Sequence, residues 1–228
     1  MRKKALLIFL AGAALGAGGM YLWLSYRYQR GPFEANWVRS PAAPSGGDRK
    51  WAEPLQAPGL ENLHRVSPQL YRGAQPTAEG ISQLKGMGVR TVVNLRSFHS
   101  DRDLIGDTGL GYEHIYMKAR HAEDKEVVRF LQIVTEESRT PVFVHCQFGS
   151  DRTGLMCAVY RVFICGWSKD EAIAEMTEGG FGFHRSFDNL VEYLQELDVD
   201  AISMRAGITT GPARQRGAAV SSSAPSAM

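Results

Sequence analysis

The sequence contains little cysteine and little net charge, and both shortages narrow the range of functions. Only three of its 228 residues are cysteines, with no Cys-x-x-Cys pair, which is too few for a disulfide scaffold. The six histidines lack the spacing of metal ligands. Basic and acidic residues nearly balance, 26 against 24, and neither a basic stripe nor a nucleic-acid-binding signature is present. We therefore expect no metal, no cofactor and no nucleic-acid partner.

Long apolar runs are also scarce, and the exception lies at the amino terminus. Residues 5–26 carry no charge over 22 positions, a length of about 33 Å in a helix, enough for a hydrocarbon core of ~30 Å. The aromatic residues Tyr21, Trp23 and Tyr26 at its far end favour a retained transmembrane helix within residues 1–30. A cleaved signal segment is the alternative, because small alanines follow a short apolar core.

Charge around this run predicts the orientation. Basic residues precede it, which favours a cytoplasmic amino terminus and places the rest of the chain outside the cytoplasm, in the periplasm if the source is bacterial. Signal cleavage would instead give a secreted protein. Arg27 and Arg30 follow the run and oppose this orientation.

Composition divides the remaining chain. Residues 31–60 are rich in Pro, Gly, Ala and Ser and are expected to be a flexible linker, and small residues in 201–228 indicate a disordered tail. Between them, residues 61–200 alternate helical patterns with strand-like runs near 70–72, 90–95, 114–117 and 142–145. This alternation predicts an α/β fold, a single domain with a central, largely parallel sheet flanked by helices.

Several side-chain patterns mark the helices of this domain. A helix is expected to begin at Thr77, and Ser168 with Glu171 forms a capping box for another. An apolar stripe predicts a third helix, through Phe187, Leu190, Val191, Leu194 and Leu197. Cys157 and Cys165 fall in an apolar run and are expected in the core.

The most informative segment is HCQFGSDRTG, residues 145–154, which follows an apolar run and precedes an apolar helix pattern. A cysteine in a short loop that opens a helix faces the partial positive charge and unpaired N–H groups of the helix. These surroundings favour the thiolate, so Cys146 is expected to be a nucleophile. The backbone N–H groups that follow it would hold the oxygens of a tetrahedral anion.

Other residues of this segment fit the same chemistry. The guanidinium of Arg152 can donate two parallel hydrogen bonds to one phosphate, and Thr153 places a hydroxyl near the sulfur. His145 would orient the loop and tune the Cys146 thiolate, or be an ordinary residue at the end of a strand, and Asp151 is expected to face away from the pocket. The expected phosphate-binding residues are Gln147, Phe148, Gly149, Ser150, Asp151 and Arg152. A purely structural turn, or an anion-binding loop without turnover, is the alternative.

The spacing His-Cys, five residues, Arg-Thr resembles the signature loop of the cysteine-dependent protein tyrosine and dual-specificity phosphatases. Residues 68–96, with LYRGAQPT and VVNLR, are similar to the atypical dual-specificity phosphatases of bacteria, plants and fungi. This resemblance implies two-step hydrolysis of a phosphomonoester through a cysteinyl-phosphate, without a metal. It also implies a general acid, usually an Asp on a mobile loop upstream of the cysteine.

Three residues qualify for the acid. Asp124 is the first candidate, although it lies only 22 positions before Cys146, closer than is usual in the family. Glu123 and His121 remain open. All of them precede an amphipathic helix, whose amino terminus acidic residues would stabilise in any case.

The loop also bears on the substrate. It contains no lysine, which favours a phosphoprotein carrying phosphotyrosine, phosphoserine or phosphothreonine over a polyphosphorylated small molecule. The alternatives are an inositol-phosphate or phosphoinositide phosphatase and a catalytically poor, membrane-tethered module that binds phosphorylated residues. Lys118, Arg120 and Arg185 would line a second anion site or be solvated surface charges. The sequence does not indicate an oligomeric state.

Overall fold

A computed structural model describes residues 50–208. Within this range the strands form one sheet of six in the order β1-β2-β3-β6-β4-β5. Their bounds are β1 Glu53–Pro54, β2 His64–Ser67, β3 Leu70–Gly73, β4 Thr91–Asn94, β5 Gly111–His114 and β6 Val142–His145. β3, β6, β4 and β5 pair in parallel, and β2 and β1 extend the sheet antiparallel beyond β3. The predicted α/β fold with a largely parallel sheet is confirmed.

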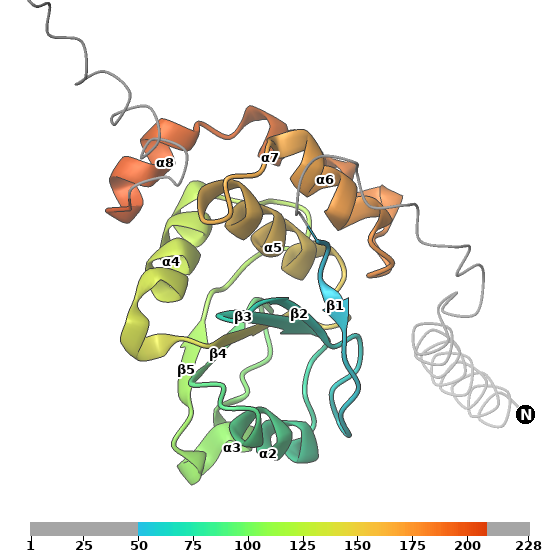
Figure 1. Ribbon diagram of the computed structural model, residues 1–228, viewed down its shortest axis with the longest axis vertical. Helices are drawn as coiled ribbons and strands as arrows, with labels where there is room; N and C mark the ends of the chain where they lie inside the picture. The colour runs from blue at the N-terminus through green and yellow to red at the C-terminus, as the bar shows by residue number, and fades with distance from the viewer. Residues whose placement is uncertain (1–49, 209–228) are drawn as a thin grey trace, which may run out of the picture. The chain divides into compact units, whose positions relative to one another are not determined.

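Helices cover both faces of this sheet (Figure 1). One face carries α2 and α3, and the other carries α4 to α8. The bounds are α2 Ala78–Gly86, α3 Arg102–Ile105, α4 Asp124–Thr135, α5 Asp151–Phe163, α6 Lys169–Glu178, α7 Asp188–Glu196 and α8 Val199–Ala206, with single 3-10 turns η1 Gly106–Thr108, η2 Glu137–Arg139 and η3 Arg185–Phe187.

Alternation along the central strands supplies a core on each face. Val93 and Val144 belong to the cluster under α4 and α5, whereas Val92 and Phe143 belong to the cluster under α2. All these side chains are buried, because a parallel sheet covered on both faces exposes neither side of its strands. A packed hydrophobic layer therefore supports the sheet on each of its two faces.

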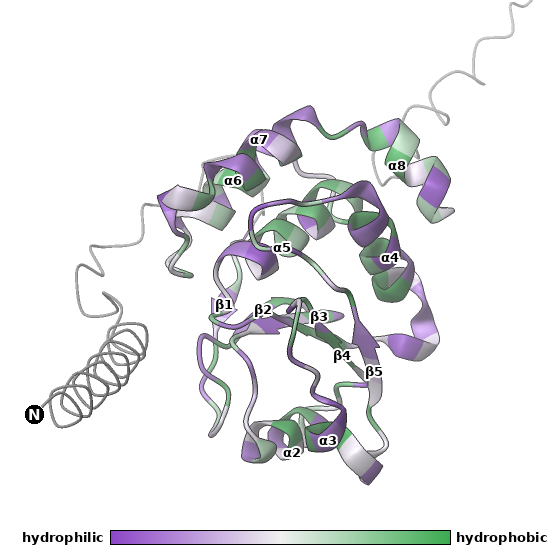
Figure 2. Cartoon of the chain, turned by 180° about the vertical axis from the view of Figure 1, so that it is seen from behind, coloured by the Kyte–Doolittle hydropathy of each residue, from purple (hydrophilic) through white to green (hydrophobic). Residues whose placement is uncertain are grey.

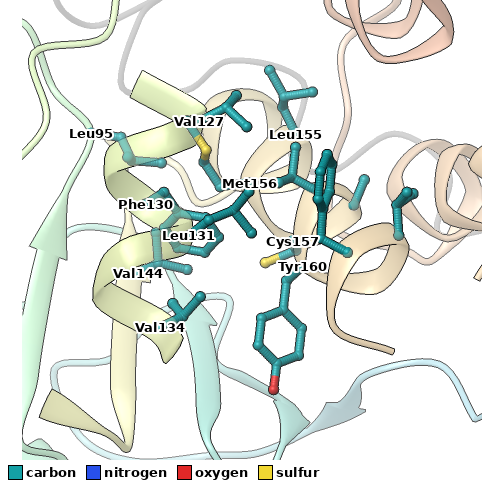
Figure 3. Packing of buried hydrophobic residues seen from close by; sticks show 14 of the residues in the cluster. Leu95, Val127, Phe130, Leu131, Val134, Val144, Leu155, Met156, Cys157 and Tyr160 are labelled. Atoms are coloured by element: carbon teal, nitrogen blue, oxygen red, sulfur yellow. The ribbon is translucent and has the colours of Figure 1, made fainter. Parts of the chain in front are cut away.

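Helix α5 lies at the centre of the larger core. Every residue from Thr153 to Phe163 is buried, as expected for a helix that is apolar around its circumference. Its side chains pack against those of α4 (Figure 3), and hydrophobic residues follow its length (Figure 2). Cys157 lies in this core, as predicted. The prediction for Cys165 was wrong, because it follows the last helical residue, Phe163, and is exposed.

The predicted helix starts at Thr77 and Ser168 are confirmed. Thr77 caps α2 by accepting a hydrogen bond from Gly80 N at 3.2 Å, and Ser168 with Glu171 forms the predicted capping box of α6. The strand expected near residues 114–117 lies earlier, at Gly111–His114. Its neighbour β4 ends at Asn94, so the chain beyond Ile115 has no strand to pair with.

Some expectations concern segments at or beyond the ends of this fold. β1 lies inside the segment expected as linker, and α8 continues past residue 200. The predicted membrane helix within 1–30 lies outside the described residues. Across residues 50–208, none of the helices has the length and apolarity needed to cross a membrane.

Candidate active site

The cysteine loop connects the end of β6 to the start of α5, at the carboxyl edge of the parallel strands. His145 is the last residue of β6 and pairs with Gly73 of β3 on one side and Asn94 of β4 on the other. Cys146 follows directly, and only 3% of its surface is exposed. The nucleophile expected from the sequence therefore sits at the edge where sheets of this kind bind ligands.

The carbonyl groups of the loop are turned outward by neighbouring segments. Gln75 N donates to Gln147 O at 3.2 Å, and Asn62 Nδ2 donates to Phe148 O at 3.0 Å. In a trans peptide the N–H of the next residue points away from the carbonyl. The N–H groups that follow these carbonyls therefore point toward the centre of the loop, as an anion cradle requires.

Arg72 completes this arrangement, in a role that no local sequence pattern predicts. From β3, its Nη2 donates to Gly149 O at 2.6 Å and to Ser150 O at 3.5 Å. The guanidinium is buried and lies over the ring of Phe181, 3.8 Å from the centroid. Arg72 thus places a buried positive charge behind the loop. Its position in the LYRG segment was the available signal, but nothing local identified its partner, which lies 77 residues away.

Gly149 is required at the tightest point of the loop. Its φ is +73°, and a Cβ built there would lie 2.5 Å from the carbonyl carbon and oxygen of Gly73. Both the left-handed backbone and the contact with β3 exclude a side chain. The loop consequently packs directly against the carboxyl end of β3.

Arg152 lies in the first turn of α5 and reaches across the sheet edge. Its Nη1 donates to Leu95 O and to Met117 O, each at 3.3 Å. These carbonyls belong to the segments that follow β4 and β5. The guanidinium is therefore held beside the loop, where its remaining N–H groups can bind a phosphate.

Two buried hydroxyls of the segment, Ser150 Oγ and Thr153 Oγ1, make no hydrogen bond to the described residues. Buried hydroxyls without partners are costly. Their positions at the start of α5 fit a site that receives an anion, and the predicted role of Thr153 near the sulfur remains a prediction.

Asp151 turns toward the chain that follows α6. Its Oδ1 accepts hydrogen bonds from His184 N at 2.9 Å, and its carboxylate lies 3.1 Å from His184 Nδ1. The carboxylate therefore braces the 180–187 segment, which explains how an acid is accommodated in an anion-binding loop.

His145 is fully buried beside the cysteine. Its Nδ1 lies 3.0 Å from Cys146 O, and its Nε2 lies 2.9 Å from Asp101 Oδ2. Asp101 is also fully buried and was not singled out from the sequence, because it follows β4 in a polar stretch without a recognisable motif.

The three candidates for the general acid lie next to the segment that contacts Arg152. Asp124 begins α4, where its Oδ1 accepts from Tyr193 Oη at 3.0 Å and its Oδ2 pairs with Arg205 Nη1 at 2.7 Å. Glu123 pairs with Lys125 at 2.6 Å, which lowers the pKa of its carboxyl group. His121 is exposed at the turn it forms with Lys118.

The proposed second anion site consists of exposed residues. Lys118, Arg120 and Arg185 are all exposed, and the guanidinium of Arg120 lies over the Phe187 ring at 5.1 Å. Within residues 50–208, no group of His, Cys, Asp or Glu side chains is arranged to hold a metal ion.

A thiol at the floor of a backbone cradle, with an arginine beside it, defines the class of cysteine-dependent phosphatases. Residues 58–188 match a family described as "DSP-PTPase phosphatase fused to NAD+ Kinase". The chain belongs to this dual-specificity phosphatase family and is a phosphatase.

Named relatives agree with this assignment. The dual specificity protein phosphatase TpbA of Pseudomonas aeruginosa (strain UCBPP-PA14) is 34% identical over 175 residues, which cover 76% of this chain and 77% of the relative. The crystal structure of a cysteine-to-serine variant of P. aeruginosa TpbA in complex with pTyr matches with a TM-score of 0.61 and 33% identity, over 75% of this chain and 99% of that chain. The catalytic domain of the PP-IP phosphatase SIW14 from S. cerevisiae, 21% identical over 67% of this chain and 94% of that chain, shares the fold with a TM-score of 0.58.

Proposed function

We propose that the protein hydrolyses phosphotyrosine residues of a protein substrate, with phosphoserine and phosphothreonine as further substrates of the same site. The observation that carries this proposal is a pair of exposed aromatic side chains on the two segments that contact Arg152. Phe98 is 94% exposed and Tyr116 is 66% exposed. Phe98 follows Leu95 closely and Tyr116 precedes Met117, and the carbonyls of Leu95 and Met117 bind the Arg152 guanidinium.

Exposed aromatic rings on the segments that hold a phosphate clamp suit an aromatic leaving group. Large apolar side chains are usually buried away from water. A pair of aromatic rings contributes about 0.5–1.5 kcal/mol in addition to the free energy of burying their surface. A phosphotyrosyl ring offers such a surface, whereas an inositol ring does not. The relative TpbA, which is 33% identical to this chain, was crystallised in complex with pTyr, and this supports the same substrate.

The proposed reaction has two steps. The Cys146 thiolate attacks phosphorus while Arg152 and the loop N–H groups bind the non-bridging oxygens, the P–O bond to the tyrosyl oxygen breaks, and that oxygen receives a proton from the general acid. A water molecule then gives a proton to the ionised form of the same acid and attacks the cysteinyl-phosphate, and the sulfur leaves as thiolate with inorganic phosphate as product. No metal takes part.

Asp124 is the proposed acid, with His121 as the next candidate. Asp124 would have to exchange its contact with Arg205 for the leaving-group oxygen when substrate binds. Glu123 remains a third candidate, although its ion pair with Lys125 lowers the pKa of its carboxyl group and so disfavours the protonated form.

The test of substrate class is phosphate release by residues 50–228 from matched peptides carrying phosphotyrosine or phosphothreonine and from inositol phosphates, with a chelator present. Faster turnover of the phosphotyrosine peptide, lost in Cys146→Ser, is expected. Phe98→Ala should raise KM for that peptide more than for a small aliphatic phosphomonoester. Turnover confined to inositol phosphates would contradict the proposal. Binding of the phosphotyrosine peptide without formation of a cysteinyl-phosphate would instead indicate a catalytically poor module that binds phosphorylated residues.

We further propose that the amino-terminal run anchors the phosphatase to a membrane, with the domain on the extracytoplasmic side. The support is the uncharged length of residues 5–26. Alkaline phosphatase and green fluorescent protein, each fused after residue 49, report the extracytoplasmic and the cytoplasmic side of the membrane, respectively. We expect alkaline phosphatase activity and no fluorescence. Intact mass of the mature chain distinguishes the anchor from a cleaved signal, since cleavage removes the apolar run.

A further inference from the structure

Asn62 has an unusual backbone in the turn before β2. Among residues 50–208 it is the only residue other than glycine with a positive φ, at +52°. Asparagine tolerates this left-handed conformation better than most residues, but glycine adopts it without steric cost. Glycine would therefore serve the turn equally well, and the side chain of Asn62 must be explained by what it contacts.

The side-chain amide of Asn62 joins two loops that lie far from it in the sequence. Its Nδ2 donates to Phe148 O in the phosphate loop, residues 146–151, and to Phe181 O in the segment after α6, each at 3.0 Å. An amide nitrogen carries two hydrogens. Both are therefore used to hold backbone carbonyls of segments that form the site.

The contact with Phe148 fixes one peptide group of the phosphate loop. Because Asn62 holds the carbonyl of Phe148, the N–H of Gly149 in the same trans peptide points the opposite way, toward the centre of the loop. The next carbonyl, Gly149 O, is held by Arg72 at 2.6 Å. Two consecutive peptide groups of the loop are thus fixed from outside it, one by an amide and one by a guanidinium.

The contact with Phe181 ties this loop to the segment that supports it. Phe181 is buried, and its ring lies 3.8 Å from the guanidinium of Arg72. Three residues further on, His184 N donates to Asp151 Oδ1 at 2.9 Å. The segment after α6 is therefore held against the phosphate loop at two points, and Asn62 provides the link at Phe181.

We propose that Asn62 is a positioning residue for phosphate binding: its amide fixes the Phe148–Gly149 peptide group so that Gly149 N–H donates to a non-bridging oxygen of the bound phosphate. Without the amide this peptide group can rotate and turn its carbonyl oxygen toward the phosphate, which repels the anion. The proposal rests on the phosphatase chemistry of the loop and is independent of the proposed preference for phosphotyrosine.

Asn62→Gly separates the side-chain amide from the turn, because glycine keeps the left-handed backbone. The experiment uses the full chain, in detergent because of its apolar amino-terminal run. We expect calorimetry to show that inorganic phosphate binds about tenfold more weakly than to the wild type. The value of kcat/KM for p-nitrophenyl phosphate should fall by roughly the same factor or more. Wild-type phosphate affinity in a folded Asn62→Gly protein would overturn the proposal.

Glu61→Ala is the matched control in the same turn. It removes an exposed side chain and keeps the backbone hydrogen bond from Ala74 N to Glu61 O, so phosphate affinity should equal that of the wild type. Asn62→Asp keeps the shape of the side chain but has no hydrogen to donate when ionised. This variant should lose at least as much phosphate affinity as Asn62→Gly, and an undiminished affinity would count against the proposal.

A measurement on the wild type covers the case in which the Asn62 variants fail to fold. Proton–nitrogen-15 spectra report the backbone amide of Gly149, and we expect its resonance to move when inorganic phosphate is added, because the N–H then donates to a phosphate oxygen. In folded Asn62→Gly the shift should be smaller. A Gly149 amide resonance that does not respond to saturating phosphate in the wild type would overturn the proposal.

Discussion

The Arg72 guanidinium donates to the carbonyl of Gly149 across 2.6 Å, and this contact joins the middle of the sheet to the phosphate loop. Arg72 has no carboxylate among the partners described for it, only loop carbonyls and the face of Phe181. Its charge therefore remains available to the site. Arg72 supports the loop from behind while Arg152 faces the substrate.

We expect Arg72→Lys to impair both the loop and the fold. A lysine loses the planar contact with Phe181 and cannot reach two carbonyls from one rigid group. The loss should be about 1–3 kcal/mol of unfolding free energy and roughly tenfold in kcat/KM. Urea unfolding and steady-state kinetics measure the two effects.

Arg65→Lys, on the neighbouring strand β2, serves as the control for Arg72→Lys. Arg65 is exposed and pairs with Glu53 at 2.5 Å, and such surface pairs contribute about 0–1 kcal/mol. Kinetics equal to the wild type in both variants would show that Arg72 does not position the loop.

A methyl group at Gly149 should impair activity strongly. Gly149→Ala forces a Cβ to within 2.5 Å of Gly73 backbone atoms in a left-handed conformation, so the loop must move away from β3. We expect kcat/KM to fall more than about 100-fold, because a displacement of about 1 Å can cost that much. Inorganic phosphate should also bind more weakly, as measured by calorimetry.

Gly86→Ala provides the comparison at an unconstrained position. Gly86 is the last residue of α2, and a Cβ there meets nothing within 4 Å. This variant should keep full activity and gain up to about 1 kcal/mol of stability, since alanine favours the helix. If Gly149→Ala were equally active, close packing of the loop on β3 would be irrelevant to catalysis.

The three thiols should react in an order set by the activation of Cys146 at the start of α5 and by the exposure of the other two. Burial raises the pKa of Cys157 to about 11, so at pH 8 it is protonated and its surroundings exclude reagents. Iodoacetamide at pH 8 should modify Cys146 first and the exposed Cys165 next, and should leave Cys157 intact until the protein unfolds. Peptide mass spectrometry gives the order, with protein in 6 M guanidinium, roughly the concentration that unfolds most domains, as the fully reactive control.

The same raised pKa predicts a loss of stability in alkali. Because the folded-state pKa of Cys157 lies above its ordinary value of 9.0, its contribution is complete below pH 9 and is lost as the pH rises through about 11. Modification of Cys157 in folded protein at pH 8 would contradict both expectations.

The sequence predicted what is encoded locally. The strand–loop–helix around Cys146, the caps at Thr77 and Ser168, and the parallel sheet all follow from short patterns whose chemistry is contained within a few residues. Asn62, Arg72 and Asp101 could not be found in this way. Each acts on a loop or a histidine far along the chain, and a polar residue at such a position looks like any surface residue until the fold buries it.

The errors have physical causes of the same kind. Cys165 follows an apolar run, but the helix ends before it reaches that residue. The chain from Ile115 to Met117 alternates between buried and exposed residues like a strand. The neighbouring strand β4 ends at Asn94, however, so these residues have no strand to pair with. Periodicity indicates which side chains turn inward, whereas a strand also needs a neighbour.

The general acid is testable through the leaving group. Asp124→Asn should slow hydrolysis of phenyl phosphate, a poor leaving group, by about 100-fold or more and should change hydrolysis of 2,4-dinitrophenyl phosphate little, because only the former needs a proton. Asp200→Asn changes an exposed acid of α8 and should leave both rates unchanged.

Equal losses on both substrates would mean that Asp124 supports the helices through Tyr193 and Arg205, and the same loss in Tyr193→Phe would then identify the contact responsible. A selective loss in His121→Gln, with Asp124→Asn unaffected, would move the acid to the turn at residues 118–121, beside the carbonyl of Met117 that binds Arg152.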